Sequence, residues 1–162
     1  MGRDCFESAI VPMKRVWTIG YEQATVPAVI GVLTAAGIEV LADVRALPLS
    51  RRPGFSKTAL AGAVQEAGIA YRHFKALGTP KEGREAARKG DRAGLESVYA
   101  GQLELPEALA AAAQLRDLAS EHRVALLCFC GDAAKCHRSL LHAAMLADFE
   151  AVHLQPEISQ TR

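Results

Sequence analysis

The stretch "RVALLCFCGDAAKCHRSLLHAAMLADF" (residues 123–149) has the pattern of a buried strand, a loop and a helix. Residues 123–130 are almost entirely apolar, which is typical of a strand covered on both faces of a parallel sheet. Gly131 and Asp132 begin a loop, and residues 136–149 have a helical composition. We therefore expect a strand–loop–helix unit, with residues 123–130 as the central strand of its sheet.

Similar runs alternate along the rest of the chain. We expect further strands at 15–20, 38–45, 69–74 and 150–154, and helices at 25–37, 56–68 and 105–122. Residues 75–94 are polar, glycine-rich and basic, and should combine loop with one short helix. This alternation predicts a three-layer α/β fold, with a mainly parallel sheet of about five strands and helices on both faces.

The composition places the chain among ordinary globular domains. Of its 162 residues, 50% are hydrophobic and 23% charged, and the net charge of +1 supplies no whole-molecule attraction for nucleic acid. We expect one domain over residues 15–155, between a flexible leader (1–14) and a frayed tail (156–162). No apolar run approaches the roughly 20 residues of a membrane helix. The cysteines at 5, 128, 130 and 136 form no disulfide framework, which predicts a reduced, cytoplasmic setting.

In open parallel sheets, ligands bind beyond the carboxyl ends of the strands. At those positions the sequence has several anion-binding side chains and backbone groups, and we expect Gly20, Tyr21, Arg45, Ser50, Arg51 and Arg138 to form an anion site. Its ligand would be a phosphate-bearing or other anionic molecule, such as a nucleotide or a nucleic-acid end. Arg52, Lys81 and Arg84 would add positive charge to the same rim. The alternative for Arg138 is a structural ion pair with Asp43 or Glu22.

Four residues at this edge could carry chemistry. Asp43, Glu22 and His137 could move protons, and Cys136 could be a nucleophile because a helix N-terminus and a nearby arginine lower a thiol pKa. These residues suggest hydrolysis or transfer on a nucleotide-like substrate. A non-catalytic module that senses a nucleotide or binds a protein stays open, as do enzymatic activity and oligomeric state.

The cysteines offer a third interpretation, a thiol/redox or zinc-binding protein. Cys128 and Cys130 share a face if the strand stays regular, and Cys136 and His137 could approach from the helix start. The commoner role of a cysteine in an apolar run is that of a small core hydrophobe. We therefore predict no cofactor, and keep zinc, bound through Cys130, Cys136 and His137, as an alternative.

Four ordered motifs resemble the domain of unknown function 488 family. They are "WTIGYE", "ADVRALPLSRRPGF", "LGTPKEGR" and "LLCFC-x5-CHRSLL", which together cover roughly residues 15–149. The resemblance implies a compact α/β fold of bacterial and archaeal cytoplasmic proteins without an assigned reaction. It also implies that Gly20, Tyr21, Asp43, Arg45, Ser50, Arg51, Cys136, His137 and Arg138 are motif positions. Where the family pattern has a glutamate, this chain has Cys130, which supplies an extra thiol.

Overall fold

The computed structural model describes residues 14–158. The predicted leader, apart from residue 14, lies outside the described residues, as do the last four residues of the predicted tail. None of the helices in the described part is long and apolar enough to cross a membrane.

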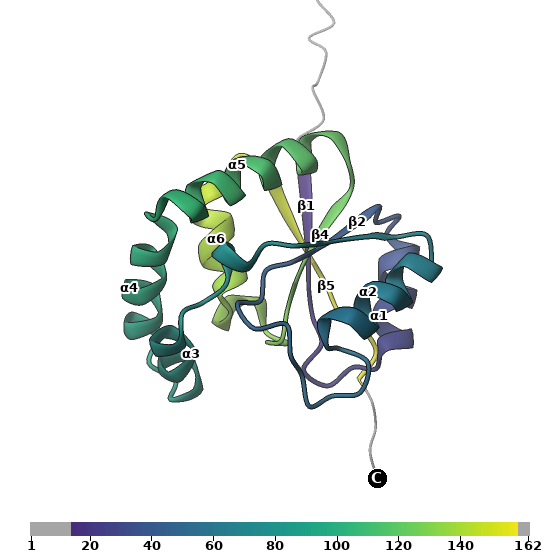
Figure 1. Cartoon of the computed structure of the whole chain (residues 1–162), viewed down its shortest axis with the longest axis horizontal. Helices are drawn as coiled ribbons and strands as arrows, with labels where there is room; N and C mark the ends of the chain where they lie inside the picture. The colour runs from purple at the N-terminus through teal and green to yellow at the C-terminus, as the bar shows by residue number, and fades with distance from the viewer. Residues whose placement is uncertain (1–13, 159–162) are drawn as a thin grey trace, which may run out of the picture.

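A five-stranded parallel sheet forms the centre of the molecule (Figure 1). Its strands are β1 (Arg15–Gly20), β2 (Val40–Asp43), β3 (Ala70–His73), β4 (Val124–Cys128) and β5 (Glu150–Leu154). Their order across the sheet is β3-β2-β4-β1-β5, and every pair is parallel. The predicted parallel sheet is confirmed, with the apolar strand β4 at its centre.

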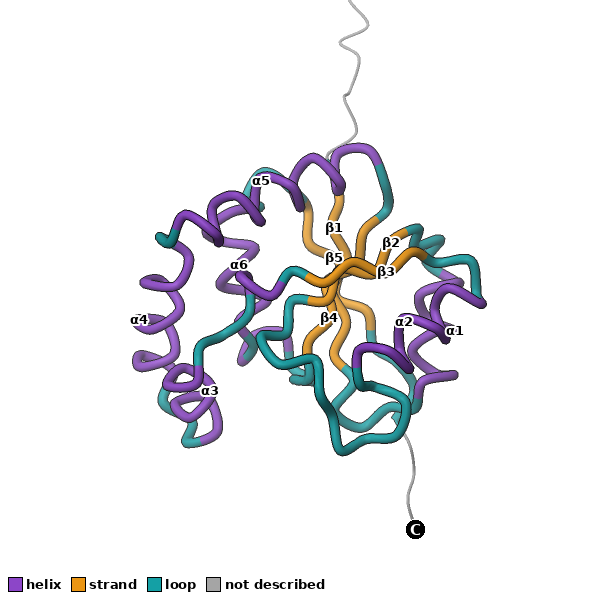
Figure 2. Tube along the Cα trace, in the orientation of Figure 1, coloured by secondary structure: helices purple, strands orange, loops and turns teal. Residues whose placement is uncertain are grey.

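Helices cover both faces of the sheet, which gives three layers (Figure 2). The helices α1 (Val26–Ala35) and α2 (Lys57–Glu66) pack on one face over a core that includes Ile19, Leu41 and Leu127. The other face is covered by α4 (Arg92–Leu103), α5 (Pro106–Glu121) and α6 (His137–Met145), and α3 (Lys81–Arg88) packs against α4. Short 3₁₀ turns occur at Lys75–Leu77 and Ala133–Lys135.

The predicted signals at the ends of α1 are present in the structure. The Thr25 side chain accepts a hydrogen bond from the Ala28 N–H, and Pro27 lies in the first turn. Gly37 adopts a φ of 71°, a left-handed conformation that ends the helix at little steric cost.

Two differences from the predicted elements affect the functional edge. The strands β2 and β4 end at Asp43 and Cys128, two residues earlier than predicted, so Arg45 and Cys130 belong to loops. Helix α4 was not predicted, although its buried residues Leu95, Tyr99 and Leu103 recur every four positions. Two glycines weaken its intrinsic helix propensity, and packing against α3, α5 and α6 compensates for this.

Candidate functional site

The carboxyl ends of β1, β2 and β4 are neighbours in the sheet, so the residues that follow these strands meet at one edge. Two buried polar groups form there. One is an ion-pair network around Asp43, and the other is a cluster of thiols and one imidazole at the start of α6.

Asp43 and Arg45 form a buried bidentate ion pair. The Arg45 Nε and Nη2 atoms donate to the two Asp43 carboxylate oxygens at 2.8 and 2.7 Å, and the Arg45 N–H donates to the same carboxylate at 3.1 Å. The Tyr71 hydroxyl also donates to Asp43. Only 5% of Arg45 and none of Asp43 is exposed, so each charge needs the other as a partner.

The remaining Arg45 donors are directed at the β1 and β2 loops. Its Nη1 atom donates to the Tyr21 hydroxyl at 3.0 Å and to the Phe55 carbonyl at 2.7 Å. The Tyr21 and Phe55 rings stack with centroids 4.3 Å apart. Burial lowers the pKa of Arg45, but the Asp43 carboxylate more than offsets this, so the net pKa is raised and the guanidinium stays charged. This arrangement ties two loops together within the protein.

Arg138 is a second buried arginine, 1% exposed. Its Nη2 atom donates to the Cys130 carbonyl at 2.7 Å, and its Nε atom donates to the Cys136 sulfur at 3.4 Å. The alternative of a pair with Asp43 or Glu22 is not what the structure contains, because no carboxylate within residues 14–158 forms an ion pair with Arg138. Within residues 14–158, the group that contacts the Arg138 guanidinium and can carry a negative charge is the Cys136 sulfur.

Gly20 makes the close backbone approach at this edge. A Cβ atom at Gly20 would lie 1.8 Å from the Cys130 carbonyl oxygen and 3.0 Å from Arg138 Nη2. The Cys130 backbone is thus held between Gly20 and Arg138. Only glycine fits at this position without moving the loop that carries the Cys130 thiol.

The sulfurs of Cys128, Cys130 and Cys136 lie within 4.8 Å of one another. Cys128 is the last residue of β4, Cys130 lies two residues beyond it, and Cys136 is the N-cap of α6. Cys128 and Cys136 are 7% and 1% exposed, whereas Cys130 is half-buried. All three are free thiols, so their sulfurs are available for a shared ion or for reaction with one another.

The His137 ring lies against the same sulfurs. Its Nδ1 atom is 3.4 Å from Cys128 Sγ and 3.7 Å from Cys136 Sγ. Its Nε2 atom lies 2.9 Å from the Val44 carbonyl, which can only accept, so Nε2 carries a proton. In the neutral ring the Nδ1 lone pair is then directed at the thiols. The Tyr99 ring packs edge-on against the imidazole, with centroids 5.3 Å apart.

Among the three thiols, the interactions within the cluster favour deprotonation of Cys136. Burial raises the pKa of Cys136, but contacts with Cys128, Cys130 and His137 outweigh it, so the net pKa lies well below the usual thiol value. The contact with Cys130 lowers the pKa of Cys128, but the contact with Cys136 and burial outweigh it, so the net pKa is raised. The contacts with Cys128 and Cys136, together with burial, raise the pKa of Cys130. Burial lowers the pKa of His137, but the Cys136 thiolate reverses this and raises it.

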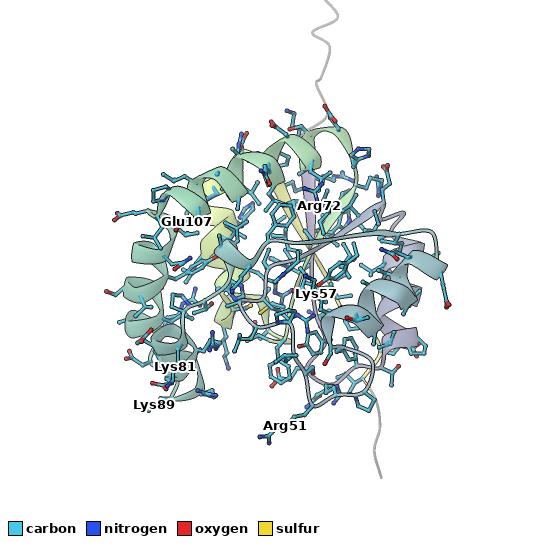
Figure 3. The ribbon with its side chains drawn as sticks, in the orientation of Figure 1. Arg51, Lys57, Arg72, Lys81, Lys89 and Glu107 are labelled. Atoms are coloured by element: carbon cyan, nitrogen blue, oxygen red, sulfur yellow. The ribbon has the colours of Figure 1, made fainter. Side chains whose placement is uncertain are left out.

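The other predicted anion ligands lie at the surface and are not gathered into one pocket. Arg51 is exposed and extends away from the ribbon, whereas Lys81 lies on α3 in a different part of the molecule (Figure 3). Ser50 accepts from the Arg52 N–H, and the Arg52 guanidinium donates to the Ala24 carbonyl. Two further predicted residues have protein partners, because Arg84 donates to the Thr79 carbonyl and Glu22 accepts from the Gly131 N–H.

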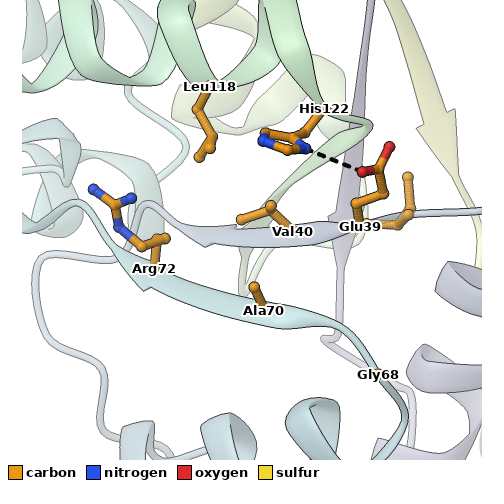
Figure 4. Close-up of a pocket in the computed structure, with 8 residues that line it drawn as sticks. Glu39, Val40, Gly68, Ala70, Arg72, Leu118 and His122 are labelled. Atoms are coloured by element: carbon orange, nitrogen blue, oxygen red, sulfur yellow. Dashed lines mark hydrogen bonds and ion pairs between the residues drawn. The ribbon is translucent and has the colours of Figure 1, made fainter.

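Two surface cavities lie away from the thiol cluster. One, of about 490 Å³, is at the amino ends of β2 and β3, where Arg72, Leu118 and the His122–Glu39 ion pair line it (Figure 4). The other, of about 420 Å³, lies between the start of α1 and the loop before α2. Neither is lined by Asp43, Cys136, His137 or Arg138.

Sequence reasoning missed three contributors to the site, which are the Val44 carbonyl, Tyr71 and Tyr99. Val44 contributes only a backbone atom, so its side chain gave no signal. Tyr99 could have been found from its place in the i, i+4, i+8 apolar pattern of α4.

Comparisons with known proteins identify a family and no activity. A family model described as a domain of unknown function, DUF488, matches residues 25–145. No curated protein and no solved structure matches the chain.

Proposed function

Because the chain belongs to the DUF488 family, a domain family of unknown function, we propose a function from the site itself: Cys128, Cys130, Cys136 and His137 bind one transition-metal ion, best fitted by Zn²⁺. Three cysteines and one histidine are an established ligand set for zinc, which prefers thiolate and imidazole in a tetrahedral arrangement. With four protein ligands the site is closed, so the proposal is one of metal binding and assigns no reaction.

The observation that carries the proposal is the position of His137 Nδ1. Tetrahedral zinc, with sulfur at about 2.3 Å and nitrogen at about 2.0–2.1 Å, requires sulfur and nitrogen about 3.6 Å apart. The distances from Nδ1 to the Cys128 and Cys136 sulfurs are 3.4 and 3.7 Å. Tetrahedral geometry also places the sulfurs about 3.8 Å apart, so sulfurs within 4.8 Å need to close by at most about 1 Å.

The surroundings of these ligands support the same proposal. The Nε2 hydrogen bond to the Val44 carbonyl fixes the tautomer in which Nδ1 can coordinate, which is how metal-binding histidines are commonly oriented. Three thiolates around a divalent ion leave one net negative charge. The buried guanidinium of Arg138, 3.4 Å from Cys136 Sγ, balances it.

Zinc stoichiometry tests the proposal. Reduced, metal-free protein is titrated with Zn²⁺ against a chromophoric chelator, and we expect about one tightly bound ion per chain. Cys130→Ser should weaken binding by at least about tenfold, because it removes a ligand. Cys5→Ser leaves all four proposed ligands in place and is the matched control, which should bind as the wild type does. Equal affinities in all three proteins would refute the site.

Binding of a phosphate-bearing ligand stays a prediction, as does a protein-interaction role. A phosphate at this edge would have to take donors of Arg45 and Arg138 from their present acceptors, or rely on exposed residues such as Arg51. A thermal-shift screen with nucleotides and inorganic phosphate addresses this prediction. Stabilisation that disappears in Arg51→Ala would favour it.

A further inference from the structure

We infer that the proposed metal site is redox-controlled: a peroxide oxidises Cys130 and Cys136 to a disulfide, and the ion leaves. The inference rests on the proposed metal binding, because it concerns the release of that ion. Its basis is the proximity of the sulfurs, their unequal exposure and a fold that does not need the metal.

The hydrophobic core forms without the ion. Two hydrophobic clusters, one on each face of the sheet, bury residues of β1, β2 and β4 and of the helices above them. Structural zinc is essential where a small domain lacks such a core. Here the cluster lies at the edge of a sheet that is already covered on both faces. Loss of the ion should therefore leave the fold intact, as a reversible site requires.

Cys130 is the most accessible of the three clustered thiols. Cys128 and Cys136 are 7% and 1% exposed, so a dissolved oxidant meets the half-buried Cys130 first. Cys130 lies beyond the last residue of β4, in a loop whose backbone is held by the Arg138 bond to the Cys130 carbonyl, the Glu22 bond to the Gly131 N–H and the edge-on packing of Phe129 on Tyr21. Rotation about the Cys130 side-chain bond can move its sulfur by the small distance that a disulfide needs while these backbone contacts stay in place.

Cys136 is the thiol best placed to form a disulfide with Cys130. Arg138 donates both to the Cys130 carbonyl and to the Cys136 sulfur, and so holds the first beside the second. Cys128 is a poorer partner, since its backbone is fixed in β4, where its carbonyl accepts from the Tyr21 N–H. A bridge from Cys128 to Cys130 would also close a ring across one intervening residue, which conflicts with disulfide geometry.

The chemistry balances with hydrogen peroxide as the oxidant. The Cys130 sulfur, which is a thiolate when it is a ligand of the ion, attacks one peroxide oxygen, the O–O bond breaks, and the departing hydroxide takes up a proton to form water. The Cys136 thiolate then attacks the sulfenic sulfur of Cys130, the S–S bond forms, and a second hydroxide leaves and is protonated. Two thiolates, two protons and one peroxide give one disulfide and two waters. Cys128 and His137 alone then retain the ion weakly.

The test uses zinc-loaded full-length protein with the Cys5→Ser substitution, so that only the three clustered thiols remain. Hydrogen peroxide is added, and released zinc is measured with a chromophoric chelator while peptide mapping identifies disulfides. We expect loss of most of the bound zinc, a Cys130–Cys136 bridge, an unchanged circular dichroism spectrum, and recovery of binding after dithiothreitol. The same mapping on metal-free protein should find the same bridge.

The outcomes separate this inference from the metal site itself. Zinc that binds and stays bound under peroxide overturns the redox inference and leaves the metal site standing. Failure to bind zinc overturns the proposed function, and with it the inference that its release is controlled. Release without a Cys130–Cys136 bridge, or with loss of the folded spectrum, also overturns the redox inference.

Discussion

Replacing Gly20 by alanine tests how the Cys130 loop is held. The added Cβ would lie 1.8 Å from the Cys130 carbonyl oxygen, whereas such contacts are essentially never shorter than 3.0 Å. The loop must therefore move by more than about 1 Å, since the obstacle is backbone and cannot rotate away. That movement breaks the 2.7 Å bond from Arg138, a hydrogen bond to a charged group worth about 1.5–3 kcal/mol.

We expect Gly20→Ala to lower the free energy of unfolding by about 2–4 kcal/mol. It should also weaken zinc binding by about 10–100-fold, the usual effect of disturbing the groups that orient metal ligands. Urea denaturation followed by circular dichroism measures the first effect, and competition with a chromophoric chelator measures the second.

Gly31→Ala is the matched control. A Cβ at Gly31 meets nothing within 4 Å, and the residue lies inside α1, where alanine is favoured by about 0.5–1 kcal/mol. This variant should be as stable as the wild type or more so, with unchanged zinc affinity. Our account of the loop is refuted if Gly20→Ala behaves like Gly31→Ala in both measurements.

Three further predictions concern the supports of the site and the sheet. Asp43→Asn leaves the buried Arg45 without a counter-charge and should lower the free energy of unfolding by about 3–5 kcal/mol in urea denaturation, and a loss below about 1 kcal/mol would contradict a buried pair. Tyr99→Phe removes a 2.7 Å bond to the Leu77 carbonyl and should cost about 1–3 kcal/mol in the same assay, so wild-type stability would speak against that bond. Burial and the charge of Arg138 lower the pKa of His153, so below about pH 6.5 the unfolded chain binds the proton more readily and stability should decrease as the pH falls. At higher pH His153 is neutral in both the folded and the unfolded chain, so its contribution to the pH dependence vanishes. The stability of His153→Gln should therefore decrease less steeply than that of the wild type as the pH falls. Equal pH dependence of the free energy of unfolding in both proteins would refute a lowered pKa of His153.

The layer arrangement could be predicted from the sequence because it depends on local patterns. Apolar runs such as residues 124–128 fit only a strand covered on both sides, and the alternation with helices leaves a parallel sheet as the simplest solution. Helix α4 escaped prediction because Gly94 and Gly101 weaken its local signal, while its stability comes from packing. Tertiary contacts of this kind are absent from any local window.

The sequence predicted which residues lie at the site better than it predicted which of them contact one another. The sequence placed Asp43 and Arg45 at the ligand edge, and it could not show that β2 ends at Asp43, after which the loop directs Arg45 back to the carboxylate. The thiols of Cys128, Cys130 and Cys136 were weighed as a group. The decisive feature, the Nδ1 orientation of the adjacent imidazole, depends on a carbonyl 93 residues away in sequence.

Cobalt substitution reports on the proposed ligand set of Cys128, Cys130, Cys136 and His137 itself, because Co²⁺ takes the place of Zn²⁺ and its absorption spectrum depends on ligand type and geometry. We expect strong visible bands typical of tetrahedral Co²⁺, with thiolate-to-metal charge-transfer bands in the near ultraviolet, saturating at about one ion per chain. Weak octahedral bands without charge transfer, or a spectrum unaltered by Cys136→Ser, would contradict this ligand set.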